Sequence, residues 1–179
     1  MMNEYYYLAY GSNLSMRQMA HRCPDAVPVG LAKLEGYRLV FRGSGSGNYL
    51  SVDSEPGSGE SVECLVWRVT QRDIVKLDAY EGFPEFYTRF RVPVSIRPFV
   101  GEQEVTVGAF AYALDPDEHA LGLPTASYLN ICREGYQRFG VSEDAIRAAL
   151  LYSAERKGRK RAEILWKRSD PFEYEYEYE

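Results

Sequence analysis

Glu81 is a carboxylate placed where helix stability gives no reason for one. The apolar spacing predicts a helix over residues 71–81, with Gly82 as the residue that ends it. At 100° per residue, Ile74, Leu77 and Glu81 share one face, so a carboxylate lies on the apolar side of the last turn, where the helix dipole disfavours it. Burial raises the pKa of such a group toward neutrality, which suits a general acid/base. We therefore interpret Glu81 as a catalytic residue.

Two alternatives stay open for this helix face. Glu81 could pair with an arginine such as Arg89 for purely structural reasons, because a buried carboxylate needs a partner. Asp78 flanks the same face and is a second candidate for the proton transfer, alone or together with Glu81.

A second stretch that could do chemistry is Tyr10-Gly11-Ser12-Asn13-Leu14-Ser15. It follows an aromatic and apolar run that predicts a buried strand, and Ser15 with Gln18 has the spacing of a capping box that opens a helix. A strand that leads into a helix in this way points backbone N–H groups at one spot, where the helix adds about half a positive charge. We expect this spot to bind a carboxylate or a developing oxyanion. A tight turn without a ligand is the alternative.

Tyr128 is a candidate pocket hydroxyl near the start of a later helix that Thr125 can cap, although a helical tyrosine is more often part of the core. No metal-ligand spacing is visible among the three cysteines and two histidines, so we expect no metal. The cysteines are widely separated, which predicts buried free thiols in a reducing compartment: Cys23, Cys64 and Cys132.

Short strands alternating with turns must position these side chains. The pattern predicts strands within residues 5–10, 27–42 with a break near Gly36, 49–53, 62–69, 86–98 and 104–114. About six strands joined by short connections favour a small closed barrel, because closure removes exposed edges. The glycine-rich segment 43–48 has no Gly-Lys-Ser/Thr after it, so it is interpreted as a hairpin loop or active-site flap.

The composition fits one domain with a tail. The 179 residues carry a formal net charge of -5, and residues 170–179 alone hold five acidic and no basic side chains. The remainder is therefore neutral overall, and nucleic acid is not an expected partner. No apolar run approaches the ~18 residues of a membrane span and no signal peptide is visible, so we expect no membrane association and a cytoplasmic location.

The division of the chain is expected near residue 155. Residues 1–155 form the predicted domain, and residues 156–179 hold a basic run followed by a low-complexity tail of alternating Glu and Tyr. Like charges at every second residue oppose stable pairing, so the tail is predicted to be flexible or to lie over the basic run.

In combination, these motifs resemble the gamma-glutamylcyclotransferase-like family. The resemblance rests on Tyr10 to Leu14, on Leu77-Asp78-Ala79-Tyr80-Glu81-Gly82 with Tyr87 and Arg89 beyond it, and on Pro124-Thr125-Ala126-Ser127-Tyr128-Leu129. It covers residues 5 to about 140 in the expected order. The resemblance implies an α+β fold, a small mixed β-barrel with helices packed around it. It also implies an enzyme of glutathione metabolism that releases 5-oxoproline from a gamma-glutamyl amide with no cofactor.

The same resemblance assigns roles to particular residues. The family's catalytic glutamate falls on Glu81, which would move a proton while the substrate's α-amine attacks its own γ-carbonyl. The implied substrate-binding residues are Tyr10, Gly11, Ser12, Asn13, Leu14, Tyr87 and Tyr128. The expected partner is a small gamma-glutamyl molecule, with a homodimer as the candidate assembly. An enzyme for an unusual gamma-glutamyl amine or natural-product intermediate, and a binding or regulatory module without chemistry, are the alternatives.

Overall fold

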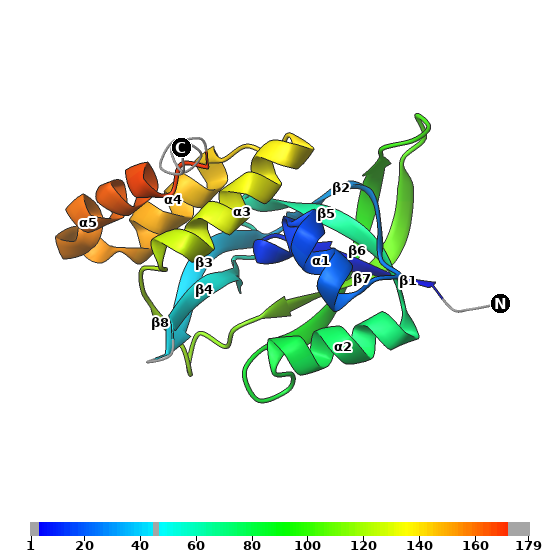
Figure 1. The fold of residues 1–179 in the computed structure, drawn as a ribbon, viewed down its shortest axis with the longest axis horizontal. Helices are drawn as coiled ribbons and strands as arrows, with labels where there is room; N and C mark the ends of the chain where they lie inside the picture. Colours follow the sequence, from blue (N-terminus) through cyan, green and yellow to red (C-terminus); the bar gives the residue numbers. More distant parts are fainter. Residues whose placement is uncertain (1–3, 45–46, 172–179) are drawn as a thin grey trace, which may run out of the picture.

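Five strands close into a barrel in the computed structural model, which describes residues 4–44 and 47–171 (Figure 1). The barrel strands, in spatial order, are β1 (Glu4–Ala9), β5 (Ser61–Thr70), β2 (Val27–Glu35), β6 (Thr88–Pro98) and β7 (Val105–Ala113). Neighbours are antiparallel except β1 and β7, which close the barrel in parallel through Tyr6 and Tyr7. The expected α+β fold with a small mixed barrel is therefore confirmed, although the closed part has five strands and not about six.

The difference in strand number comes from the segment after Gly36. Gly36 adopts a φ of 76°, a left-handed conformation that glycine reaches without strain, and it separates β2 from β3 (Tyr37–Ser44). β3 pairs with β4 (Gly47–Ser54) and with β8 (Ala120–Leu121) in a separate three-stranded sheet of order β4-β3-β8. The hairpin predicted around 43–48 is present, and its tip at residues 45–46 lies outside the described residues.

The helices fall into two groups. The helices of the first group come directly after barrel strands in the chain: the 3₁₀ turn η1 (Ser12–Leu14) and α1 (Met16–Arg22) come after β1, and α2 (Gln71–Glu81) comes after β5. The second, α3 (Ala126–Phe139), α4 (Asp144–Ser153) and α5 (Glu155–Arg168), gathers beside the second sheet at one end of the molecule (Figure 1). α4 packs on β3, where the Phe41 N–H donates to the Ser153 hydroxyl at 2.8 Å. None of the helices in the described ranges is both long and apolar enough to cross a membrane.

The basic run at residues 156–161 is part of α5, which contacts α3 and α4. Ala162 on this helix has no exposed surface, and Arg133 of α3 donates to the Trp166 carbonyl at 2.7 Å. The Glu/Tyr tail at residues 172–179 lies outside the described residues. A division of the chain at residue 155 and a tail that docks on the basic run stay predictions.

Most of the helix boundaries follow the local signals in the sequence. The capping box of α2 is complete, and Gly82 ends the helix at a φ of 66°. Thr125 caps α3 as expected, and Gly140 ends it at a φ of 68°. At α1, the Ser15 hydroxyl accepts from the backbone N–H of Gln18, so half of the predicted box forms. The N-cap of α4 is Glu143, and the hydroxyl of the preceding Ser142 accepts from the Asp144 N–H at 3.3 Å.

The core fills the barrel and continues under α3 and α4. Its largest fully buried side chains include Trp67, Tyr136 and Phe41. All three cysteines are free and buried, as the sequence predicted: Cys23, Cys64 and Cys132.

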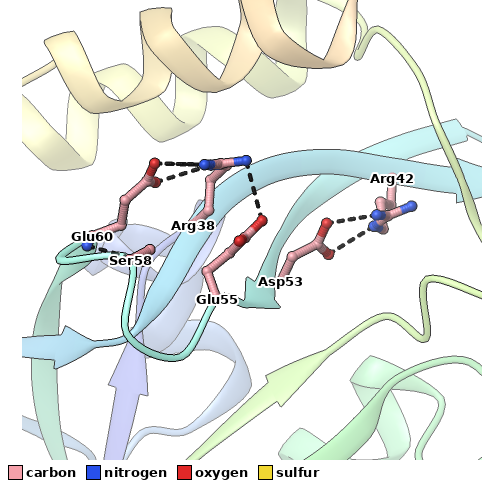
Figure 2. Close-up of polar contacts among 6 residues, drawn as sticks. All are labelled: Arg38, Arg42, Asp53, Glu55, Ser58 and Glu60. Atoms are coloured by element: carbon pink, nitrogen blue, oxygen red, sulfur yellow. Dashed lines mark hydrogen bonds and ion pairs between the residues drawn. The ribbon is translucent and has the colours of Figure 1, made fainter.

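Two arginines on the same face of β3 tie the second sheet together (Figure 2). The Arg42 guanidinium donates to both carboxylate oxygens of Asp53, at 2.8 and 2.5 Å, and to the His119 carbonyl at 2.8 Å. Arg38 forms ion pairs with Glu60 at 2.7 Å and with Glu55 at 3.1 Å. These contacts fix the strand β4, whose residues Tyr49 and Leu50 reach the site described below.

Asp53→Ala is expected to destabilise the fold by about 3 kcal/mol, because it leaves the buried Arg42 charge without its carboxylate. The Arg42 and Asp53 side chains are only 11% and 15% exposed. Glu60→Ala, in the connection between β4 and β5, is the control for the second arginine of β3, and it is expected to cost below about 1 kcal/mol because the Arg38–Glu60 pair is solvated. Urea unfolding of the two variants at neutral pH measures the contrast, and equal losses would contradict it.

Candidate active site

Glu81 ends α2 at the mouth of a pocket between the barrel and α3. Leu77, one helical turn earlier, has no exposed surface and anchors this face of the helix in the core. The Glu81 side chain is partly buried, and its Oε1 accepts a hydrogen bond from the Asn13 amide at 3.1 Å. The structure therefore brings together the two stretches that the sequence singled out, which are 68 residues apart.

Three buried contacts hold the loop that carries Asn13. The Trp67 indole N–H donates to the Asn13 carbonyl at 2.9 Å, and the Tyr136 hydroxyl donates to the Tyr10 carbonyl at 2.7 Å. A Cβ added at Gly135 of α3 would lie 2.5 Å from Leu14 Cβ, so only glycine lets this helix approach the loop so closely. The loop is thus fixed by the barrel on one side and by α3 on the other.

The loop conformation differs slightly from the expected strand-to-helix turn. A 3₁₀ turn, closed by the Leu14 N–H to the Gly11 carbonyl at 3.1 Å, stands between β1 and α1. The first N–H groups of such a turn have no acceptor within the turn itself. Ser12 and Asn13 contribute these groups beside the pocket, where they could meet a carboxylate or an oxyanion.

Asn13 connects Glu81 to two further side chains. Its amide nitrogen also donates to the Tyr7 hydroxyl at 2.9 Å, and its amide oxygen accepts from the Arg22 guanidinium. Because a guanidinium can only donate, Arg22 fixes which end of the amide faces Glu81. Arg22 itself is held by the Tyr80 ring, whose centroid lies 3.4 Å from its guanidinium carbon, and by a hydrogen bond to the Tyr80 hydroxyl.

Tyr87 and Tyr128 both reach the backbone of Leu50 on β4. The Tyr87 hydroxyl donates to the Leu50 carbonyl at 3.2 Å, and the Tyr128 hydroxyl accepts from the Leu50 N–H at 3.1 Å. A Cβ at Gly11 would lie 3.2 Å from the Tyr128 hydroxyl, so the loop and this tyrosine are in close contact. The Tyr87 proton is used by the Leu50 carbonyl, and the Tyr128 hydroxyl also forms a hydrogen bond with the Cys132 thiol.

Two adjoining pockets share Ser12, Glu81, Tyr87 and Tyr128 in their walls. The inner one, about 40 Å³, is lined by polar groups of the loop and by tyrosine hydroxyls. The outer one, about 340 Å³, opens past rings from β4, α2 and the segment that follows α2. Glu81 lies at the boundary between them.

Burial raises the pKa of Glu81 from 4.5 to about 7, against the opposing effects of the nearby Arg22 charge and the Asn13 hydrogen bond. Burial also raises the pKa of the tyrosine hydroxyls that line the inner pocket, so they stay protonated at neutral pH: Tyr7, Tyr10, Tyr87, Tyr112 and Tyr128. The site therefore combines one carboxyl group that can take or give a proton near neutrality with neutral hydrogen-bonding groups.

Arg89, the arginine considered as a structural partner for Glu81, pairs with Asp78 instead. Both Asp78 oxygens accept from Arg89, at 2.8 and 2.7 Å, and the Tyr112 hydroxyl donates to one of them at 2.6 Å. Asp78 lines neither pocket. Its carboxylate is thus an ion-pair partner that packs α2 against β6 and β7.

Of the expected site residues, all but Leu14 line the inner pocket: Tyr10, Gly11, Ser12, Asn13, Glu81, Tyr87 and Tyr128. Leu14 does not line this pocket, because its side chain has no exposed surface and packs beneath the loop against Gly135. Its N–H is occupied by the Gly11 carbonyl, so Leu14 supports the loop and offers no group to the pocket.

Sequence reasoning missed Tyr7, Arg22, Leu50 and Tyr112. Tyr7 lay inside a predicted buried strand, and its alternation with Ala9 could have placed it on one face with the loop that follows. Arg22 had no signal beyond a basic residue at a helix end. Leu50 and Tyr112 reach the site only through strand pairing and barrel closure, which local sequence does not encode.

The arrangement suits proton transfer at a polar carbonyl compound. In the ranges that the structure describes, no three His, Cys, Asp or Glu side chains are grouped so as to hold an ion. A substrate carbonyl placed between the loop N–H groups and Glu81 would find donors for its oxygen and a base for a nearby amine.

A family model described as "Gamma-glutamyl cyclotransferase, AIG2-like" matches residues 7–130 of the chain. The match runs from β1 to the first turns of α3, so it includes both the loop and Glu81.

Individual relatives agree with this match. A gamma-glutamylcyclotransferase of Mus musculus is 33% identical over 102 residues, which is 51% of this chain and 52% of the relative. A gamma-glutamylcyclotransferase of Bos taurus is 32% identical over 97 residues, half of each chain. The chain thus spans about half the length of the curated relatives that it matches.

Solved structures support the fold. One titled "Gamma-glutamyl cyclotransferase" aligns with a TM-score of 0.67 at 23% identity, over 79% of this chain and 83% of its own. YkqA from Bacillus subtilis aligns with a TM-score of 0.64 at 21% identity, over 86% of this chain and 55% of its own. At such identities the likeness establishes a shared architecture.

Proposed function

Because the chain belongs to the AIG2-like gamma-glutamyl cyclotransferase family, we propose that it releases 5-oxoproline from a gamma-glutamyl amide, with Glu81 as the general acid/base. The observation that carries this proposal is the Glu81 carboxyl group at the pocket boundary, with a pKa of about 7 and a hydrogen bond from Asn13 of the loop. The names of the curated relatives support the same activity.

The proposed reaction is an intramolecular displacement. The α-amine nitrogen of the substrate attacks its γ-carbonyl carbon, a lactam C–N bond forms, and the C–N bond to the leaving amine breaks. Glu81 accepts the proton that the attacking nitrogen loses and returns a proton to the departing nitrogen, so substrate yields 5-oxoproline and an amine without water. The nucleophile is already tethered to its target, so the protein needs mainly to fold the substrate.

The loop supplies the electrostatic part of the mechanism. N–H groups of Ser12 and Asn13 would receive the γ-carbonyl oxygen as it gains charge, or the substrate α-carboxylate. One such oxyanion contact is commonly worth ~3 to 4 kcal/mol in the transition state. The Tyr128 hydroxyl, which accepts from the Leu50 N–H, lines the same pocket next to Gly11 of the loop.

The direct test measures 5-oxoproline release from gamma-glutamyl dipeptides and gamma-glutamyl amines by the purified full chain. Release from at least one of these amides is the expected result. A folded protein that releases nothing from the whole set, or that binds the amides without cleaving them, would refute the proposal and indicate a binding module.

The pH dependence tests the role of Arg22. Since Glu81 must be ionised to accept a proton, kcat/KM is expected to rise with pH through about 7, the pKa of Glu81. The Arg22 charge lowers that pKa, so Arg22→Gln should move the rising limb to higher pH, whereas Arg22→Lys should leave it close to the wild-type position. The measurement is kcat/KM against pH for wild type, Arg22→Gln and Arg22→Lys. If the rising limb of Arg22→Gln lies at the wild-type pH, the Arg22 charge does not lower the pKa of Glu81.

A further inference from the structure

The walls of the outer pocket are mainly aromatic. The Tyr49 ring meets the Tyr128 ring edge to face at 5.2 Å and the Phe86 ring at 6.2 Å. Phe86 in turn packs edge to face against Tyr87 at 5.3 Å. Together these rings form a box beside Glu81 that leaves about 340 Å³. Flat apolar groups fit such walls through offset or edge-to-face contacts.

The described side chains that line the outer pocket include no counter-charge for an anion, and the nearby Arg22 guanidinium stacks on the Tyr80 ring. Within the described part of the chain, its lining contains no lysine, arginine or histidine, and its ionisable carboxyl group is Glu81. The guanidinium of Arg22 is taken up by Asn13 and by the Tyr80 hydroxyl, and Arg22 lines neither pocket. A carboxylate in this box would therefore find neutral donors such as Ser12 and Gln18, but it would meet no cationic side chain of the lining and would face the Glu81 charge.

From this chemistry we propose that the outer pocket binds the leaving group, and that the leaving group is a primary arylalkylamine without a carboxylate. The inference rests on the proposed cyclotransferase activity and names its substrate class. The polar inner pocket, with the loop N–H groups and the Asn13 amide, takes the gamma-glutamyl part, so the scissile amide lies beside Glu81 at the boundary.

The amine product fits the same surroundings. Once Glu81 returns its proton, the departing nitrogen leaves as a neutral primary amine. A second proton, taken from solvent water, converts it to an ammonium group, which the rings of Tyr49, Phe86 and Tyr128 attract through cation–π contacts. An amino acid as leaving group would bring its α-carboxylate to the carbon next to that nitrogen, within reach of Glu81. The repulsion would disfavour ionised Glu81, the form that accepts the proton.

The test compares amides that differ only in one carboxylate. Gamma-glutamyl-tyramine is paired with gamma-glutamyl-tyrosine, and gamma-glutamyl-phenethylamine with gamma-glutamyl-phenylalanine. We expect kcat/KM for 5-oxoproline release to be higher for the amine member of each pair by about tenfold or more. Equal values, or a preference for the amino-acid member, would overturn the inference.

A variant that supplies a charge provides a second readout. Tyr49→Lys places an ammonium group in the aromatic wall, and Tyr49→Gln is its neutral control. For each pair, kcat/KM of the carboxylate-bearing amide is divided by kcat/KM of the amine amide. This ratio should be about tenfold higher in Tyr49→Lys than in Tyr49→Gln. The wild-type comparison stands by itself if neither variant folds.

The outcomes separate this inference from the proposed function. Release from gamma-glutamyl dipeptides such as gamma-glutamyl-alanine, with none from the two arylalkylamines, would overturn the leaving-group assignment and leave the cyclotransferase activity standing. Absence of release from every amide would refute the activity itself, and the assignment with it.

Discussion

Glu81→Gln is expected to lower kcat for 5-oxoproline release by about 10³-fold, within the range found for removal of a general acid/base. The amide keeps the size of the side chain and can still form a hydrogen bond with Asn13, but it can neither accept nor return a proton. KM should change little, because the loop and the tyrosines that would hold the substrate are untouched. Steady-state kinetics with the best amide of the substrate set provide the measurement.

The stability of the same variant separates a catalytic from a structural role. The pKa of Glu81 is about 7 in the folded protein and near 4.5 in the unfolded chain, so the folded state binds the proton more tightly. Ionisation therefore lowers the stability of wild type as pH rises from about 4.5 through 7, and glutamine removes this loss. Glu81→Gln should be more stable than wild type at pH 8, by about 1–3 kcal/mol, with the difference shrinking toward pH 5.

Asp78→Asn is the matched control on the same helix. Asp78 pairs with Arg89 and Tyr112, so its neutral variant should lose stability while kcat stays within a few-fold of wild type. If instead Asp78→Asn abolished turnover and Glu81→Gln retained it, the proton transfer would belong to Asp78. A Glu81→Gln protein that unfolded more easily at pH 8 would indicate a structural carboxylate.

The parts of the site that could be predicted are those that local rules specify. The Thr70 capping box and the Gly82 stop fix the register of α2, and with it the face on which Glu81 lies. Likewise, Ser15 fixes the start of α1, and so the end of the loop. Glu81 stood out because it breaks the rules of helix design at its position, and such conflicts between local and global preference mark functional sites.

The parts that could not be predicted depend on tertiary structure. Arg22 enters the site because α1 and α2 pack together. Leu50 enters because β4 contacts β7 of the barrel and its backbone meets the hydroxyls of Tyr87 and Tyr128. The number of barrel strands was overestimated for a related reason. A strand pattern shows that a segment is extended, but the turn at Gly36 decides which sheet it joins.

Asn13→Ala is expected to lower kcat/KM by about 10²-fold, because the Asn13 side chain organises more of the site than any other group there. Its amide donates to Glu81 at 3.1 Å and to Tyr7 at 2.9 Å, and it accepts from Arg22. Without it, the Glu81 carboxylate loses a hydrogen bond that lowers its pKa, so the rising limb of the pH profile should also move to higher pH.

Asn13→Asp tests this explanation with an isosteric change. The aspartate keeps an acceptor for Arg22 but replaces the amide donor that faces Glu81 with a carboxylate oxygen. Two adjacent carboxylates repel each other when both are ionised. The pKa of the pair should then be raised further than in Asn13→Ala, and activity near pH 7 should fall more steeply while recovering in part at high pH. If Asn13→Asp kept the wild-type profile, the amide of Asn13 would hold the loop in place without acting on Glu81, and the acid/base function would depend on burial and Arg22 alone.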